Sequence, residues 1–160
     1  MSGGILKTIE HRWKELGIPF RPGLERDTVS AFERRYRVRL PASVRSFYEF
    51  IDGMPAGYTD EELISFWPLT EVTPVPEKLA GCRGIPDYGG IEESLPEAAS
   101  FFVFADHSIW LNVYAVQLSA DSMASAPVIW IGGGDCWHVL APSFGEFLAR
   151  YAQEPSSVLV

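Results

Sequence analysis

Asp106, His107 and Ser108 stand side by side in the sequence, and their types are those of a carboxylate, a base and a nucleophile. Such a trio performs acyl transfer when the histidine activates the serine and the carboxylate orients the histidine. That geometry is three-dimensional, and neighbours on one short turn seldom face each other productively. No GxSxG or HExxH motif accompanies them. We therefore interpret them as a polar hairpin turn, with a small hydrolase or ligand-binding protein using Asp106 and His107 as an alternative.

Cys136 and His138 have the side chains and the spacing of a pair of metal ligands. Two residues apart on a strand, they would point to the same face. Closed zinc sites need four ligands, however, and Cys82 has no CxxC or HxxxH partner to help supply them. An alternating strand with its cysteine packed in the core explains the pair without metal. We predict no metal and no cofactor.

Three consecutive glycines, Gly132 to Gly134, follow a predicted strand and raise the question of a phosphate-binding loop. Such a loop needs a helix N-terminus directly after the glycines. The segment Cys136 to Leu140 instead has the composition of a second strand. The glycines therefore predict a hairpin loop.

Acidic residues gather between residues 58 and 97, where the chain is rich in proline and glycine and aromatic residues are interleaved. Large rings surrounded by charge make good interface anchors, because the rings supply buried area while the charges steer encounter. We predict a partner-binding surface here, with a solvated loop that has no partner as the alternative. Its candidate residues, including the acid and base of the hairpin turn, are Tyr58, Asp60, Glu61, Glu62, Asp87, Tyr88, Glu92, Glu93, Asp106 and His107.

The net charge of −8 is unevenly distributed along the 160 residues. Residues 1–50 hold ten Lys/Arg and six Asp/Glu, a net +4, which leaves −12 for the remainder. A negative field of this kind repels nucleic acid and attracts basic proteins, although solubility alone is an alternative reading. No apolar run has the length of a membrane span or of a signal-peptide core. We expect a cytoplasmic protein with two reduced cysteines, no nucleic acid and no membrane partner.

Apolar residues recur at helical spacing in three N-terminal segments. The first runs from Ile5 to Leu16 and stops at Gly17; the second is opened by Asp27 and runs through Tyr36. The third starts at Pro41 and ends at Asp52-Gly53, with the glycine free to adopt a left-handed conformation. A fourth helix follows Ser143, whose spacing to Glu146 is that of a capping box.

Strand patterns fill most of the region between the third and fourth helices, apart from irregular loops over Glu71 to Pro96. The order of elements predicts an α+β fold: N-terminal helices, a mainly antiparallel sheet of about four to six strands and a C-terminal helix, in one domain spanning residues 1–160. The predicted strands are Ile64–Leu69, Phe101–Ala105, Trp110–Leu118, Val128–Ile131 and Cys136–Ala141. One core is expected to contain Leu40, Val44, Phe47, Ile51, Phe144, Phe147 and Leu148.

Two segments, Phe32 to Gly53 and Leu140 to Leu148, resemble the signatures of the SUKH superfamily, which is named for a fungal cell-wall-synthesis regulator and its bacterial relatives. The shared features are an acidic helix residue, a Leu-Pro that opens a helix ending in glycine, and a closing Ser-Phe-x-x-Phe-Leu helix. Phe66 to Val72 is similar to the family's first strand and the turn after it. The sequence departs from the pattern at the short turn Asp106 to Ser108 and in the longer, proline-rich stretch 73–100.

The resemblance implies a strongly bent sheet, no catalytic residues and a function in binding proteins. Bacterial members are similar to immunity proteins, which bind and neutralise a toxin, whereas others are regulators that recruit partners. We therefore predict an immunity protein that binds a basic toxin domain, with a regulatory adaptor as the first alternative and the small hydrolase as the second. The oligomeric state is left open.

Overall fold

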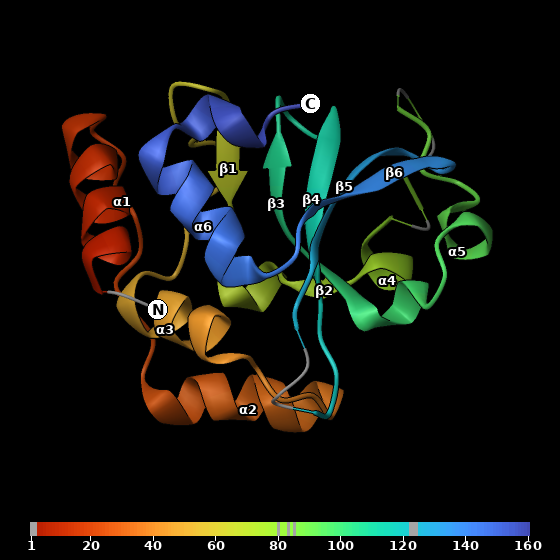
Figure 1. Ribbon diagram of the computed structural model, residues 1–160, viewed down its shortest axis with the longest axis horizontal. Helices are drawn as coiled ribbons and strands as arrows, with labels where there is room; N and C mark the ends of the chain where they lie inside the picture. Colours follow the sequence, from red (N-terminus) through yellow and green to blue (C-terminus); the bar gives the residue numbers. More distant parts are fainter. Residues whose placement is uncertain (1–2, 80, 83, 85, 122–124) are drawn as a thin grey trace.

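The fold is described from a computed structural model, which covers residues 3–79, 81–82, 84, 86–121 and 125–160 (Figure 1). Three helices come first, two short helices lie in the middle, and a longer one closes the chain. They are α1 (Gly3–Glu15), α2 (Arg26–Tyr36), α3 (Ala42–Phe50), α4 (Val75–Leu79), α5 (Ile91–Ser94) and α6 (Phe144–Gln153), with the 3₁₀ turns η1 (Leu69–Glu71), η2 (Ala98–Ser100) and η3 (Pro155–Val158).

The sheet is antiparallel and open, and this confirms the predicted α+β fold. Its strands follow the order β1-β3-β4-β5-β6, and β2 pairs with β3 as well. The strands are β1 (Ile64–Phe66), β2 (Thr73–Pro74), β3 (Phe101–His107), β4 (Asn112–Gln117), β5 (Val128–Gly133) and β6 (Cys136–Ala141). Both hairpins of the second half were predicted from the sequence, but the first loop covers residues 108–111 and not 106–108.

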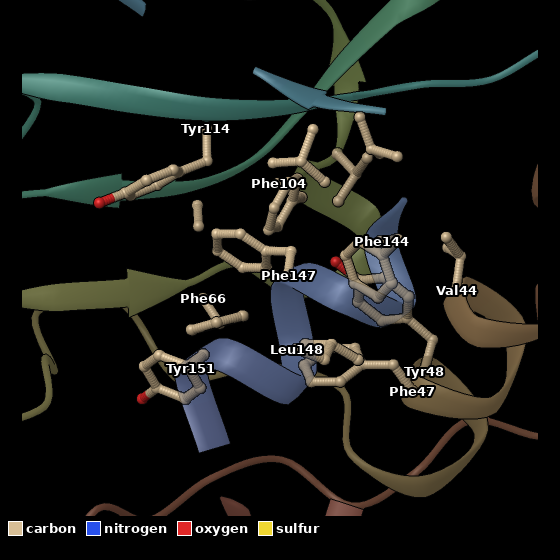
Figure 2. Packing of buried hydrophobic residues seen from close by; sticks show 14 of the residues in the cluster. Val44, Phe47, Tyr48, Phe66, Phe104, Tyr114, Phe144, Phe147, Leu148 and Tyr151 are labelled. Atoms are coloured by element: carbon tan, nitrogen blue, oxygen red, sulfur yellow. The ribbon is translucent and has the colours of Figure 1, made fainter. Parts of the chain in front are cut away.

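Helices cover both faces of this sheet (Figure 1). On one face, α1, α2, α3 and α6 enclose the larger hydrophobic cluster, in which Phe66, Phe104 and Phe147 are completely or almost completely buried (Figure 2). All seven residues predicted for the core belong to this cluster. On the other face, α4 and α5 bury a smaller cluster that includes Tyr88, Ile91 and Val103. The stretch predicted as loops therefore forms the second helical layer.

Helix ends agree with the sequence to within a residue or two. Ser143 caps α6 by accepting a hydrogen bond from the backbone N–H of Glu146, as predicted. Gly53 adopts the predicted left-handed conformation (φ 68°), and a side chain there would collide with the backbone of Trp67. Asp27 was predicted to cap α2, but the N-cap is Glu25 and Asp27 lies in the first turn. In the described ranges, no helix combines the length and the apolarity needed to cross a bilayer.

Candidate protein-binding surface

A β-bulge in β3 decides the direction in which Asp106 points. The register with β4 shifts between Val103 and Ala105, so that Phe104 and Ala105 both belong to the larger cluster. After this shift Asp106 lies opposite Val113, which belongs to the smaller cluster. Because directly paired residues share one face of a sheet, the bulge turns Asp106 toward the layer of α4 and α5.

Asp106 connects two tryptophans through its two carboxylate oxygens. The indole N–H of Trp67 donates to Oδ1 at 2.7 Å, and the backbone N–H of Trp110 donates to Oδ2 at 3.1 Å. The two indole rings pack with centroids 5.0 Å apart. Burial raises the pKa of Asp106, and the hydrogen bonds from Trp67 and Trp110 oppose that rise. The carboxylate thus fixes the start of the β3–β4 turn.

Asp106 and His107 do not form the acid-base pair of the hydrolase alternative. The carboxylate of Asp106 is engaged by the two tryptophans, while Nδ1 of His107 lies 3.3 Å from the side-chain amide nitrogen of Asn112. Successive residues of a strand point to opposite faces, which separates the two side chains. A cavity of about 450 Å³ is lined by Asp106, Trp67 and Trp110, whereas neither His107 nor Ser108 belongs to its lining.

Cys136 and His138, the two candidate metal ligands on β6, lie in different surroundings. The ring of His138 stacks on Trp130 with centroids 5.0 Å apart. Cys136 is exposed, so the prediction that it packs in the core was wrong; its position next to the glycine turn leaves it uncovered. Within the part of the chain that the structure describes, no three His, Cys, Asp or Glu side chains come close enough to hold a metal ion.

The β3–β4 turn has a left-handed backbone made of residues other than glycine. Ser108, Ile109 and Trp110 have φ values of 53°, 53° and 68°. A left-handed conformation costs roughly 1–2 kcal/mol per L-residue, and a β-branched side chain makes it a clear outlier. The conformation is held from both sides. The hydroxyl of Tyr88 donates to the carbonyl of Trp110 at 2.9 Å, and the N–H of Ser108 donates to the carbonyl of Leu63 at 2.9 Å.

This backbone presents three apolar side chains to solvent at one place. Ile109 is 87% exposed, and Leu63 and Leu111 are each 51% exposed. Leu63 joins the other two because its carbonyl accepts from Ser108, and Leu63 has a positive φ of 65° as well. We call Leu63, Ile109 and Leu111 the apolar tip. Figure 1 shows the segment before β1 and the β3–β4 turn at the same end of the sheet, uppermost in the view.

Acidic residues occur in the two segments that hold the apolar tip, directly before Leu63 and around Tyr88. Glu61 and Glu62 directly precede Leu63 in the chain. In the other segment, exposed Asp87 precedes Tyr88, whose hydroxyl holds Trp110. The exposed carboxylates of Glu92 and Glu93 follow on α5, whose Ser94 donates to the carbonyl of Gly134 at 2.5 Å. We call Glu61, Glu62, Asp87, Glu92 and Glu93 the acidic flanks.

The residues predicted for the partner surface divide into an exposed and a buried group. Tyr58, Glu61, Asp87, Glu92 and Glu93 are exposed, and Glu62 and His107 are half-buried. Tyr88 is only 1% exposed, and Asp60 and Asp106 are buried, so these three support the surface from beneath and offer no side chain to a partner. Tyr88 and Asp106 are covered by the layer of α4 and α5, whereas Asp60 is covered from the side of α1 and α6, where it contacts Tyr151.

Asp60 has a structural role at the start of β1. Its Oδ1 accepts from the backbone N–H groups of Glu62 and Ile64, both at 2.9 Å, and its Oδ2 accepts from the hydroxyl of Tyr151 at 2.6 Å. That hydroxyl in turn accepts from the indole N–H of Trp13 at 2.8 Å. Asp60 therefore ties the segment carrying Glu61, Glu62 and Leu63 to α1 and α6.

Sequence reasoning missed the apolar tip. Placing the hairpin turn at residues 106–108 assigned Trp110 and Leu111 to a strand, where alternation would have buried one of them. The sequence gives no positive signal for this turn, because the run Ser108-Ile109-Trp110-Leu111 contains no residue that favours a left-handed conformation. The pattern of residue types in this region is compatible with two longer strands and also with a bulged strand followed by a strained turn. The sequence pattern therefore cannot distinguish these two structures.

Comparison with known families agrees with the fold and with the motifs of the sequence. An antiparallel sheet between two helical layers defines an α+β protein. The model of the SMI1 / KNR4 family (SUKH-1) matches residues 23–150, and the chain belongs to this family. The family is broadly linked to immunity and regulatory roles. A comparison with curated proteins gives no match.

Proposed function

We propose that this protein is a non-enzymatic binding module that neutralises a toxin by direct contact, and that the apolar tip and its acidic flanks form the interface. The observation that supports this is the exposure of Ile109 on a left-handed turn built without glycine. Such strain is retained where the surrounding structure enforces it and tends to occur at ligand-contacting sites.

The composition of the surface indicates the chemistry of the partner. Protein interfaces combine an apolar centre with a polar rim, and the apolar tip between the acidic flanks has this layout. The carboxylates favour a basic partner, since opposite charges accelerate encounter and like charges exclude wrong partners. A toxin domain with an apolar pocket bordered by Lys or Arg fits this description. The free thiols of Cys82 and Cys136 suit a cytoplasmic site of action.

Co-expression with the product of the neighbouring gene, tested first for toxicity on its own, tests the proposal. We expect the two proteins to co-purify and the host cells to survive. Ile109→Lys should raise the Kd about 30-fold, equivalent to ~2 kcal/mol, because an interface centre loses its apolar contact and gains a cation facing a basic partner. Val139→Lys is the matched control, since Val139 is an exposed apolar residue on β6.

The outcomes separate the candidate functions. Toxin binding that is unaffected by Ile109→Lys would place the interface elsewhere. Survival without complex formation would contradict neutralisation by contact. Capture of a non-toxin partner through the same Ile109-dependent surface would assign the protein to the regulatory members of its family.

A further inference from the structure

The two outer edges of the sheet differ in whether other segments of the chain hydrogen-bond to them. The outer edge of β1 is closed by its own chain: the N–H of Met54 donates to the carbonyl of Phe66 at 2.8 Å, and the N–H of Asp60 donates to the carbonyl of Ile64 at 2.9 Å. β6 lies at the other end of the strand order, and no described residue pairs with its outer edge as a strand. Apart from its pairing with β5, the backbone of β6 makes one hydrogen bond within the described residues. It is donated by the Arg150 guanidinium to the carbonyl of Leu140, at 2.7 Å.

The sequence of β6 also lacks most features that protect an edge. Exposed edge strands usually carry lysine, other charges or proline, because an open row of N–H and C=O groups pairs with any free strand. The six residues Cys136–Ala141 contain no charge and no proline, in a chain of which 21% is charged. Because the Arg150 contact lies at Leu140, the stretch Cys136 to Val139 has no outer contact among the described residues. Val139 is 60% exposed there, and Cys136 is exposed as well.

We propose that two copies of this chain associate through β6, pairing the strands antiparallel about His138 so that the two sheets become one. This inference concerns self-association and does not depend on the proposed function. A two-fold pairing centred on His138 places Val139 of each copy opposite Trp137 of the other. Trp137 and Val139 share the face of the smaller cluster, since they pair with Ile131 and Ile129. Aromatic and β-branched residues form favourable cross-strand pairs, and the pairing would cover Val139.

Charge supports a second copy as the occupant of this edge. The same pairing sets Leu140 of one copy opposite Cys136 of the other, which brings the Arg150 end of one strand beside the Asp135 end of the other. Arg150 is held against Leu140 and forms an ion pair with Glu146 at 2.7 Å, with its side chain 40% exposed, and Asp135 is exposed. At each end of the uncharged strand, Asp135 of one copy would therefore join the Arg150–Glu146 pair of the other, and the contact is self-complementary as a two-fold interface requires.

Sedimentation velocity of the intact chain over a range of concentrations tests the proposal. We expect a monomer–dimer equilibrium in the wild type and at least a 10-fold higher dimer Kd for Val139→Lys. Ile109→Lys is the matched control, because Ile109 is an exposed apolar residue on the β3–β4 turn and not on β6, and this variant should dimerise normally. A wild type that stays monomeric at the highest soluble concentration, or a Val139→Lys protein that dimerises as the wild type does, would overturn the proposal.

A second measurement addresses the register. In a Cys82→Ser background, Leu140→Cys should form an intermolecular disulfide with Cys136 on mild oxidation, because directly opposed residues of antiparallel strands lie about 4.5–5.5 Å apart at Cα. Within one strand the same two positions are four residues apart, roughly 13 Å, so the bond cannot form inside one copy. A covalent dimer on non-reducing gels supports the register. Its absence under oxidation that cross-links a control with neighbouring thiols would contradict it.

Toxin binding and self-association are separable by these two variants. Ile109→Lys is expected to lose the toxin and keep the dimer, whereas Val139→Lys is expected to lose the dimer and keep the toxin. If Ile109→Lys keeps toxin binding while Val139→Lys loses the dimer, the proposed function alone is rejected. If Ile109→Lys loses toxin binding while Val139→Lys keeps the dimer, the dimer alone is rejected.

Discussion

The indole N–H of Trp67 donates a 2.7 Å hydrogen bond to the carboxylate of Asp106, across 39 residues of sequence. Trp67 directly follows β1, and Asp106 lies near the end of β3, so the bond joins two neighbouring strands on the face covered by α4. The other carboxylate oxygen accepts from Trp110. One buried side chain therefore links the sheet to the strained turn that carries Ile109.

Asp106→Ala is expected to destabilise the protein and to loosen the turn. The variant leaves the buried Trp67 N–H without an acceptor, at a cost of about 1–3 kcal/mol. Urea titration measures this cost, and Asp135→Ala, at an exposed position, should change the free energy of unfolding by less than about 0.5 kcal/mol. Equal stability of the two variants would mean that the Trp67 bond contributes nothing.

Ile109→Gly should move stability and binding in opposite directions. Glycine adopts a φ of 53° without the steric cost of a β-branched residue, so the free energy of unfolding should rise by about 1 kcal/mol after its greater unfolded-state entropy is subtracted. Binding of the toxin should weaken, because the exposed side chain is lost. Thermal unfolding and calorimetric titration of the same preparation measure both effects, and weaker stability of the glycine variant would contradict the strain argument.

Reversing charges on the acidic flanks should slow association and leave folding nearly unchanged. Glu61→Lys with Glu62→Lys removes attraction for a basic partner at an exposed edge of the surface, and the effect should shrink as salt rises, because the screening length is about 8 Å at physiological ionic strength. Stopped-flow binding measures the on-rate. The control, Glu25→Lys with Asp27→Lys at the start of α2, makes the same change in net charge. Equal on-rates for both pairs in low salt would move the interface away from this surface, and the basic segment from Arg34 to Arg45 would then be tested.

Asp60 should make stability depend on pH in mild acid. Burial raises the pKa of Asp60, against the opposing hydrogen bond from Tyr151, so the folded state takes up the proton at a higher pH than the unfolded chain does. The stability contributed by this protonation is fully present below the unfolded pKa of about 3.9 and is lost as the pH rises through the folded pKa. Asp60→Asn removes the titration, so the wild type should gain stability relative to the variant between pH 7 and about pH 4. Denaturant titrations at the two pH values check the sign, and a difference that stays constant or reverses would contradict it.

Phe47→Ala should cost about 3–5 kcal/mol, as expected for emptying a fully buried aromatic site. The Phe47 ring packs against Tyr48, Phe66 and Phe144 and so joins α3 to β1 and α6 (Figure 2). Leu16→Ala is the control, since Leu16 is largely exposed at the end of α1. A loss below about 1 kcal/mol for Phe47→Ala would show that the site refills or that α3 packs differently.

Most helices and strands and the larger core were predictable from the sequence. Apolar spacing predicted α1, α2, α3 and α6, and it predicted that Phe47 and Phe147 would share one cluster. Helical periodicity and strand alternation are local consequences of burying one face, so they can be recognised before the partner elements are known. The glycines predicted the β5–β6 hairpin, although only Gly134 lies in its turn while Gly132 and Gly133 end β5. The serine before α6 was equally informative, because capping involves only neighbouring residues.

Which of the candidate residues face solvent depends on tertiary contacts that the sequence does not reveal. Tyr58 and Tyr88 occur in similar polar surroundings in the sequence, but Tyr88 is buried because α4 and α5 fold over the second face of the sheet. One bulge in β3 turned Asp106 inward, and contacts with Leu63 and Tyr88 forced Ile109 outward on a left-handed turn. Exposure at these positions depends on segments far away in the sequence, and the type of a residue does not indicate which segment will cover it.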